Sequence, residues 1–285
     1  MPRLTLEEVI GRIDEIPTLR QVAIKLLEII DNPNSKIEEV HRIVTQDPPL
    51  AAKILRLVNS AYMGLSTRVA DVKQAIVLLG FNMVRTMALS ISVFEALSDT
   101  DSSAEEMRQQ LWEHSIITSN LCQIIAGQDT RVDEQVAFAL GLLHDMGKMI
   151  LDAKMPQEWK QILNLMNTEK YSFQEAEQEI LRTDHAQIGA WVAEKWNLKQ
   201  ELTNGIRLHH RPLAWRSDPL QGTLRLANLL SQIESIDDAS VILHHNELIQ
   251  VARHLRIGTP RLLDLATICL HEREQAHIFI QTLSQ

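Results

Sequence analysis

Apolar residues recur at helical spacing along nearly the whole chain, and this pattern limits the fold more than any other feature of the sequence. Near the start, one helix face with the i, i+3, i+4, i+7 spacing is formed by Leu6, Val9, Ile10 and Ile13. No segment shows the sustained alternation of apolar and polar residues that is expected of a half-buried strand. The sequence therefore predicts an all-α protein.

A polar, acidic and serine-rich stretch, LSDTDSSAEE at 97–106, separates two strongly apolar helical parts. Such a shift in composition is typical of a linker between compact units. We therefore predict an N-terminal helical subdomain over residues 1–100 and a second helical subdomain over residues 107–285. Within the second, RPLAWRSDPLQG at 211–222 predicts a loop, because it is rich in turn-forming residues.

Charge and composition exclude several classes of protein. The 285 residues carry a formal net charge of −9, whereas nonspecific nucleic-acid binding requires a basic surface. The two cysteines, Cys122 and Cys269, lie in apolar helical contexts and indicate a reducing compartment without a disulfide framework. The start MPRLTLEEVIGRIDE lacks the apolar core of a signal peptide, and the segment MALSISVFEAL is shorter than the roughly 20 residues needed to cross a bilayer. We expect a cytoplasmic protein with no nucleic-acid partner and no membrane association.

An ionisable pair, His144 and Asp145, stands inside the apolar run LGLLHDMGKMI at 140–150. A helix over 133–152 would place His144 on an apolar stripe and would surround Asp145 with apolar neighbours. A buried charge is costly unless it is paired or bound to a metal, so Asp145 requires a partner. One alternative is an ordinary helix-surface ion pair with Lys148, three residues further on.

Histidines on other helical segments repeat this pattern. His114, His185 and His209 each share a stripe with apolar residues, and His210 follows His209 directly. Imidazoles and a carboxylate that converge on one point are typical metal ligands, and a divalent metal would balance the charge of Asp145 and lower the pKa of a bound water. The candidate metal ligands are His114, His144, Asp145, His185, His209 and His210.

A second interpretation of the histidines stays open at this point. Each histidine alone is better explained as a hydrogen-bonded core residue than as a metal ligand, and only their joint occurrence favours a shared site. His209 and His210 are consecutive, so on a helix their side chains point about 100° apart and need not face one site. The spacing alone thus leaves a shared polar site and a set of unrelated structural histidines as equal alternatives.

Several motifs resemble a known superfamily. WEHS at 112–115, GLLHDMGK at 141–148, HAQIGAWVAEKW at 185–196 and IRLHH at 206–210 resemble, in this order, the HD superfamily of metal-dependent phosphohydrolases. Three earlier blocks, which begin with IPTLRQ at 16, VTQDPPL at 44 and VADVKQ at 69, resemble the HDOD family, the HD-related output domain of bacterial signalling proteins. The resemblance extends over nearly the whole chain. It implies an N-terminal helical subdomain packed on an HD-like helical bundle.

The same resemblance assigns roles to single positions. His114 matches the first histidine ligand of catalytic HD proteins, and His144 with Asp145 matches their His-Asp pair. The later aspartate ligand falls within TLRLANLLSQIE at 223–234, where the matching residue is Asn228. A neutral amide removes one negative charge, which weakens both metal binding and catalysis. The glycine-tyrosine-proline motif of the cyclic-dinucleotide-degrading branch is absent, since RPLAWRS follows His210.

The resemblance implies a noncatalytic regulatory domain that contacts a signalling protein partner. A residual pocket would take a divalent metal (iron, manganese or zinc) or a nucleotide-like ligand. The alternative is a metal-dependent phosphohydrolase or phosphodiesterase that acts on a nucleotide or cyclic dinucleotide. In that alternative Lys148 is the candidate catalytic residue, the metal is held by His114, His144 and Asp145, and further ligands or phosphate contacts come from His185, His209 and His210. Asn228 favours the regulatory hypothesis. In a third hypothesis the pocket is purely structural.

Overall fold

The computed structural model describes residues 6–13, 21–28, 37–59, 65, 67–98, 105–233 and 245–283. Every regular element in this part of the chain is helical, which confirms the predicted all-α class. The N-terminal elements are α1 (Leu6–Arg12), α2 (Gln21–Glu28), α3 (Ile37–Thr45), α4 (Pro48–Val58), α5 (Val72–Leu79) and α6 (Phe81–Ser98). The later elements are α7 (Glu105–Ala126), α8 (Glu134–Leu143), α9 (Met146–Lys154), α10 (Pro156–Glu169), α11 (Phe173–Leu181), α12 (His185–Lys195), α13 (Gln200–Leu208), the 3-10 helix η1 (Ala214–Arg216), α14 (Pro219–Leu230), α16 (Asn246–His254) and α17 (Thr259–Leu283).

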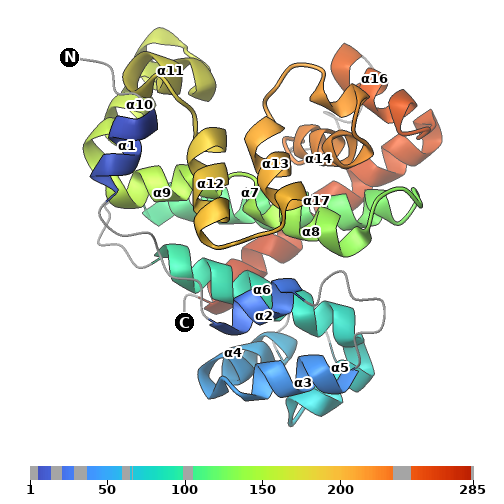
Figure 1. The fold of residues 1–285 in the computed structure, drawn as a ribbon. Coiled ribbons are helices and arrows are strands. Elements are labelled where there is room, and N and C mark those ends of the chain that lie inside the picture. The colour runs from blue at the N-terminus through green and yellow to red at the C-terminus, as the bar shows by residue number, and fades with distance from the viewer. Residues whose placement is uncertain are drawn as a thin grey trace.

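Helix α7 forms the centre of the later part of the chain (Figure 1). It packs against α8, α14 and α17, while α12 packs against α9 and α13 on the neighbouring side. The buried faces of these helices form one continuous apolar core. Helices α7 and α12 carry candidate ligands, and α8, α9 and α13 directly precede or follow the others, so the candidate ligands are held close together.

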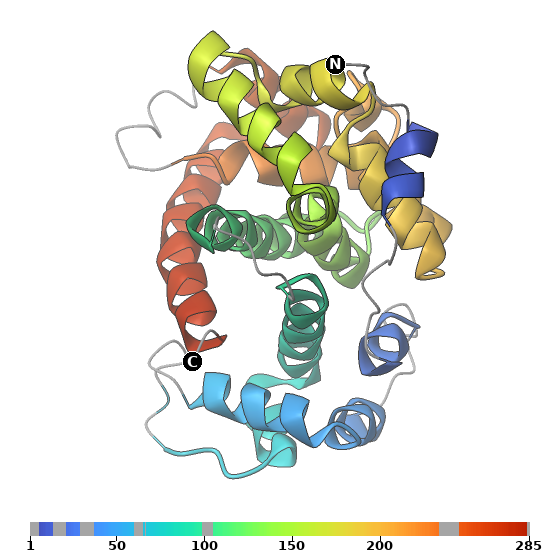
Figure 2. The same cartoon turned by 90° about the vertical axis from the view of Figure 1, so that its left-hand side faces the viewer.

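The helices α2 to α6 form a smaller layer beside this bundle. Helix α6 packs against α2, α4 and α5, and it also contacts α9. The C-terminal helix α17 leaves the bundle and reaches α4 in the smaller layer (Figure 2). Helix α1 lies instead on the bundle, where it contacts α12 and where Arg12 binds Glu158 of α10 at 2.8 Å. The boundary at residues 100 to 107 stays a prediction, and residues 99–104 of the expected linker lie outside the described residues.

Aspartate caps fix where three of the site-forming helices begin. Asp133 accepts hydrogen bonds from the amides at the start of α8, and Asp184 accepts one from Gln187 in α12. Asp218 does the same at the start of α14. A carboxylate at this position satisfies amide groups that have no partner inside the helix and interacts well with the helix dipole. These caps set the register of the helices that approach the His-Asp pair.

Two local predictions from the sequence are wrong. The expected helix over 133–152 is interrupted, because α8 ends at Leu143 and α9 begins at Met146. The expected loop at 211–222 contains η1 and the first turn of α14, since Asp218 and Pro219 form a helix start and not only a turn. The first difference arises from tertiary packing of Gly147 against His185, and the second from a local helix-start signal within the expected loop.

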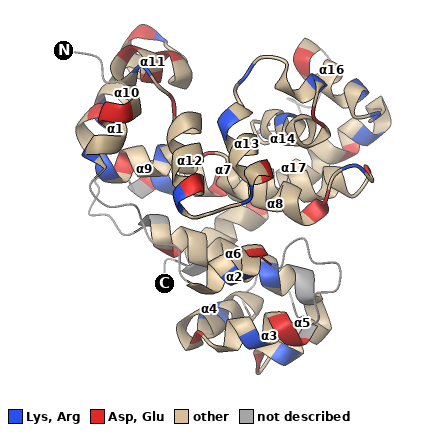
Figure 3. Ribbon diagram, viewed as in Figure 1, with Lys and Arg blue, Asp and Glu red and all other residues tan. Residues whose placement is uncertain are grey.

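The distribution of charge and the length of the helices concern two expectations from the sequence, that the protein has no nucleic-acid partner and no membrane association. In the view of Figure 3, basic and acidic residues are interspersed along the helices that the structure describes. Within the described ranges, none of the helices combines the length and the apolar character needed to cross a bilayer.

Candidate functional site

The His-Asp pair lies in a tight turn between two helices. The amide of His144 still donates to the carbonyl of Leu140 at 2.9 Å, and the carbonyl of Asp145 accepts from the amide of Lys148 at 2.9 Å. Gly147 follows directly, and a Cβ atom there would overlap the carbonyl oxygen of His185. Only a glycine therefore allows α9 to approach α12 this closely. This contact brings the turn next to the histidine that begins α12.

The Asp145 carboxylate is the centre of the site. The residue is 1% exposed. Its Oδ2 atom lies 2.6 Å from Nζ of Lys148 and 3.5 Å from Nε2 of both His114 and His144. The Lys148 pair is thus a partly buried ion pair at the core of the molecule and not an exposed pair on a helix surface.

The other carboxylate oxygen faces a second set of histidines. Oδ1 of Asp145 lies 3.1 Å from Nε2 of His185 and 3.6 Å from Nε2 of His209. His210 joins this set, because its Nε2 lies 2.8 Å from Nε2 of His185. Oδ1 is nevertheless buried without a hydrogen bond of good geometry. The structure therefore brings all six candidate ligands into one cluster, while their role as ligands stays a prediction.

The Nδ1 atoms of the histidines are held by groups behind them. Nδ1 of His144 lies 2.7 Å from the carbonyl of Gly141, and Nδ1 of His209 lies 2.6 Å from the carbonyl of Ile206. A carbonyl only accepts, so each Nδ1 carries the proton and each neutral ring presents an unprotonated Nε2 toward Asp145. Such backing partners orient metal-binding histidines in many proteins.

His185 and His114 are oriented by side chains. Nδ1 of His185 lies 2.7 Å from Oε2 of the buried Glu177 on α11. Nδ1 of His114 lies 3.2 Å from the hydroxyl of Ser231, just after α14. Ser231 in turn donates to the carbonyl of Asn228 at 2.8 Å. Asn228 itself is buried, at 7% exposure, one turn before the residue that contacts the site.

The electrostatics of the cluster follow from burial and from these pairs. Burial lowers the pKa of His144 and of His209, so both rings are neutral at pH 7. Burial works to raise the pKa of Asp145, but the facing His144 and the Lys148 ammonium outweigh it and hold that pKa well below its ordinary value. Burial also works to lower the pKa of His185, but Glu177 outweighs it and raises that pKa to about 9. Asp145 is therefore an ionised carboxylate among largely neutral imidazoles.

The donor atoms fit a divalent metal. They form two groups, and within each group the ligand atoms lie within 4.8 Å of one another. Both groups contain Asp145. The first adds His114 and His144, and the second adds His185, His209 and His210. Nε2 of His114 and Nε2 of His144 lie only 3.3 Å apart, as do Nε2 of His185 and of His209. Two unprotonated nitrogens at this distance, as expected for the neutral rings of His114 and His144, repel each other unless a proton or a cation lies between them, whereas His185, with a pKa of about 9, carries a proton on Nε2 in the metal-free protein. Imidazole with carboxylate is a donor set that zinc, iron and manganese accept.

Three residues near the site are absent from the sequence predictions: Glu177, Ser231 and Arg273. Glu177 lies within the helical stripe of α11, where a glutamate reads as a surface residue, yet it is fully buried behind His185. Ser231 and Arg273 meet only through tertiary packing, since Nη2 of Arg273 donates to the carbonyl of Ser231 at 2.6 Å from helix α17. An acidic residue between the apolar Ala176 and Leu181 was the one available hint, and it concerns Glu177 alone.

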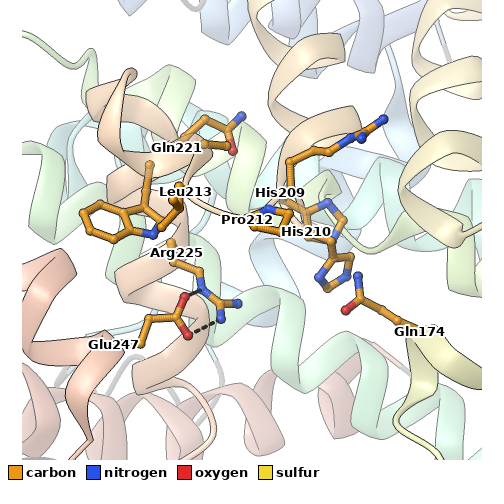
Figure 4. Close-up of a pocket in the computed structure, with 11 residues that line it drawn as sticks. Gln174, His209, His210, Pro212, Leu213, Gln221, Arg225 and Glu247 are labelled. Carbon is orange, nitrogen blue, oxygen red and sulfur yellow. Dashed lines mark hydrogen bonds and ion pairs between the residues drawn. The ribbon is translucent and has the colours of Figure 1, made fainter.

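A pocket of about 210 Å³ opens beside the second group of histidines. Figure 4 shows His209 and His210 on one side of it, with Gln174 nearby, and the ion pair between Arg225 and Glu247 on the other side. Arg225 binds Glu247 through two hydrogen bonds of 2.8 and 2.6 Å, so the charges of this wall are already compensated. The pocket gives the histidine cluster access to solvent.

Comparison with curated proteins finds bacterial relatives. An uncharacterized protein of Treponema pallidum is 26% identical over 222 residues, which cover 76% of this chain and 42% of that protein. The cyclic di-GMP phosphodiesterase CdgJ of Vibrio cholerae is 26% identical over 143 residues, which cover 50% of this chain and 30% of that enzyme. The chain thus matches less than half the length of these relatives.

Comparison with family models and solved structures identifies the domain. The crystal structure of an HDOD domain protein with unknown function from Geobacter sulfurreducens has a TM-score of 0.81 to this chain at 21% identity, and the match covers 95% of each chain. The HDOD domain model matches residues 16–212, a range that runs from the N-terminal helices to the loop after His210. On the strength of this match, the chain belongs to the HDOD domain family.

Proposed function

We propose that this chain is a regulatory domain of a bacterial signalling protein, that it holds a divalent metal in the His-Asp cluster, and that it acts through contacts with a signalling protein partner. The observation that carries this proposal is the charge of the cluster. Asp145 supplies the only carboxylate in either group of donor atoms, and the ammonium of Lys148 lies 2.6 Å from it. A single negative charge next to an ammonium neutralises little of the charge of one divalent metal ion and even less of the charge of two. The cluster therefore favours a regulatory site for one metal over a catalytic pair of metals.

The position of Asn228 supports the same conclusion. It stands where the resemblance to catalytic HD proteins expects a second aspartate, and an amide oxygen adds no negative charge. The hydroxyl of Ser231, one turn later, contacts His114 instead. Helix α14 therefore supplies neutral groups to this side of the cluster.

The pocket beside the cluster is small for a cyclic dinucleotide. Its volume of about 210 Å³ lies below the range of about 300–1,000 Å³ that is usual for ligand sites. The match to the Vibrio cholerae phosphodiesterase covers 30% of that enzyme, so the activity in its name does not pass to this chain by similarity alone. A nucleotide-like ligand at this pocket would have to be small or only partly enclosed.

One observation favours the alternative of a metal-dependent phosphohydrolase. The two donor groups share Asp145, and a carboxylate that bridges two metals is a common arrangement in enzymes that hydrolyse phosphate esters. In this alternative the cluster of His114, His144 and Asp145 is one half of the centre, and Lys148 assists the reaction. An assay for hydrolysis of a phosphate ester therefore distinguishes the phosphohydrolase from the regulatory domain.

Metal analysis and an activity assay on the same preparation test the proposal. Untagged protein purified without chelator is incubated with manganese, iron or zinc, and we expect roughly one metal per chain that is lost in Asp145→Asn. We expect no hydrolysis of cyclic di-GMP or of bis(p-nitrophenyl) phosphate. Hydrolysis by the wild type that Asp145→Asn abolishes, with folding intact, would overturn the regulatory hypothesis. A chain that takes up no metal under any of these conditions would leave a purely structural cluster.

A further inference from the structure

A second cavity lies away from the histidine cluster, where α5 and α6 meet α7 and α17. Its volume is about 350 Å³. Apolar walls come from Met83, Met87 and Phe279, among others, and polar groups come from Asn120, Gln123 and Glu272. None of the candidate metal ligands lines it. The cavity is therefore separate from the site described above.

One charged side chain, Glu272 of α17, stands among the described lining residues of this cavity. Its Oε2 atom accepts a hydrogen bond of 2.6 Å from Nδ2 of Asn120, which fixes the carboxylate at the wall. The neighbouring Arg273 donates through Nη2 to the carbonyls of Ser231 and Ile233 and so is committed elsewhere. The carboxylate is thus held in place beside the cavity without a cation bound to it in the described part of the chain.

The rest of the lining is suited to an apolar body. Met83 and Met87 are flexible side chains that adapt to ligands of irregular shape. Met83 is 41% exposed, and Val77 and Leu78, in the preceding helix α5, are exposed by 73% and 50%. Val77 and Leu78 do not line the cavity, but Leu79 of the same helix does, so exposed apolar groups lie near it in the sequence. The cavity volume lies at the lower end of the usual range of about 300–1,000 Å³ for small-molecule sites.

We propose that this cavity binds a small amphiphile that carries a protonated amine on an apolar body. The amine binds the Glu272 carboxylate, since a charge-assisted hydrogen bond at a half-buried acceptor is stronger than a neutral one. The apolar body displaces water from the surface formed by Met83, Met87 and Phe279. An anionic ligand is disfavoured, because the lining offers it a carboxylate and no cation.

The test uses 2-phenylethylamine as a probe, with the full chain labelled with ¹³C at its methionine methyl groups. Met83 and Met87 report on the cavity directly, and Met83→Leu and Met87→Leu assign their signals. We expect saturable shifts of these two signals with the amine, weaker shifts with 2-phenylethanol, and none with 3-phenylpropanoate. Glu272→Gln keeps an acceptor for Asn120 and removes the charge, and we expect it to weaken amine binding about tenfold or more.

Two further variants make the result decisive. Glu274→Gln removes the same charge from an exposed position on the same helix and is expected to leave amine binding unchanged. Gln123→Trp fills the cavity from a half-buried position and is expected to abolish binding. Thermal melts of all variants establish that they are folded. The proposal is overturned if the amine does not shift the Met83 and Met87 signals, if amine and carboxylate bind equally, or if folded Glu272→Gln binds the amine as well as the wild type does.

Discussion

Replacing Lys148 with methionine removes the ammonium group that lies nearest to the buried Asp145 carboxylate. Nζ of Lys148 lies 2.6 Å from Oδ2, and the lysine side chain lies over the ring of Phe173 at 5.1 Å, where a methionine can pack in its place. Loss of one partner of a buried pair leaves an uncompensated charge, which costs about 3–5 kcal/mol. We therefore expect metal-free Lys148→Met to be much less stable than metal-free wild type.

The size of the effect is limited by protonation of Asp145. The variant can neutralise this carboxylate at pH 7 instead of keeping it charged, which costs about 4 kcal/mol, from about 3.1 pH units at about 1.36 kcal/mol each. A loss of about 3–4 kcal/mol lowers the Tm by roughly 5–7 °C in a chain of this size, because the unfolding entropy is about 0.6 kcal/mol/K. In the wild type the pKa of Asp145 is depressed, so its contribution to stability is present above the unfolded pKa of about 3.9 and is lost as the pH falls further. In the variant this pKa is raised, so the difference in Tm grows as the pH rises from about 4 to 7.

Metal binding is expected to change in the opposite direction. The ammonium repels a dication at the same carboxylate, and at about 4 Å two unit charges interact with about 4 kcal/mol near a protein surface. Because the lysine can move, we expect a smaller gain, of about tenfold or more in affinity, measured by calorimetric titration at pH 8. Lys154→Met, at an exposed position on the same helix, is the matched control. Equal melting temperatures for metal-free Lys148→Met and wild type would refute the argument that Lys148 compensates Asp145, and weaker metal binding would refute the argument that it competes.

Three other variants test the groups that hold the cluster together. Gly147→Ala pushes α9 away from α12, because its Cβ would overlap the His185 carbonyl, and it should lower both the Tm and metal uptake. Glu177→Gln keeps an acceptor for Nδ1 of His185 but removes its charge, and it should weaken metal binding about 10- to 100-fold while the chain stays folded, as measured by titration and circular dichroism. Arg273→Met leaves the carbonyls of Ser231 and Ile233 without their donor and should lower the Tm by roughly 2–6 °C in a thermal melt.

Each of these variants has a control in the chain. Gly127→Ala places its Cβ 3.3 Å from a flexible glutamate side chain, so it should be tolerated where Gly147→Ala is not. Glu179→Gln on α11 removes a charge from the same helix but leaves the Glu177 acceptor of His185 Nδ1 in place, and it should leave metal affinity unchanged. Arg253→Met, exposed on α16, controls for Arg273→Met. Equal effects in a variant and its control would contradict the proposed role.

The fold class and the membership of the cluster were predictable from the sequence, but the local geometry was not. Apolar periodicity identified the helices, and the charged pair inside an apolar run singled out His144 and Asp145. The interruption of the helix at this pair depends on the contact between Gly147 and the His185 backbone, which joins segments about 40 residues apart. The roles of Glu177 and Ser231 depend in the same way on which helices pack together. Periodicity reports which face of a helix is buried, and it does not report what that face meets.

The unsatisfied groups of the cluster support the proposal of a binding centre over that of a purely structural one. A buried ionic network that serves stability alone needs every lone pair and proton satisfied, and apolar residues of similar size are often at least as stable. Here Oδ1 of Asp145 accepts no hydrogen bond of good geometry, and two pairs of imidazole Nε2 atoms face each other at 3.3 Å. These are the atoms that a bound cation would engage, while on the far side of the rings the Nδ1 atoms of His114, His144, His185 and His209 each have a partner in the protein. The unsatisfied oxygen and nitrogen atoms thus lie on the side of the cluster that faces Asp145. This arrangement is expected of residues that are positioned to bind a ligand and not of residues that only fill a core.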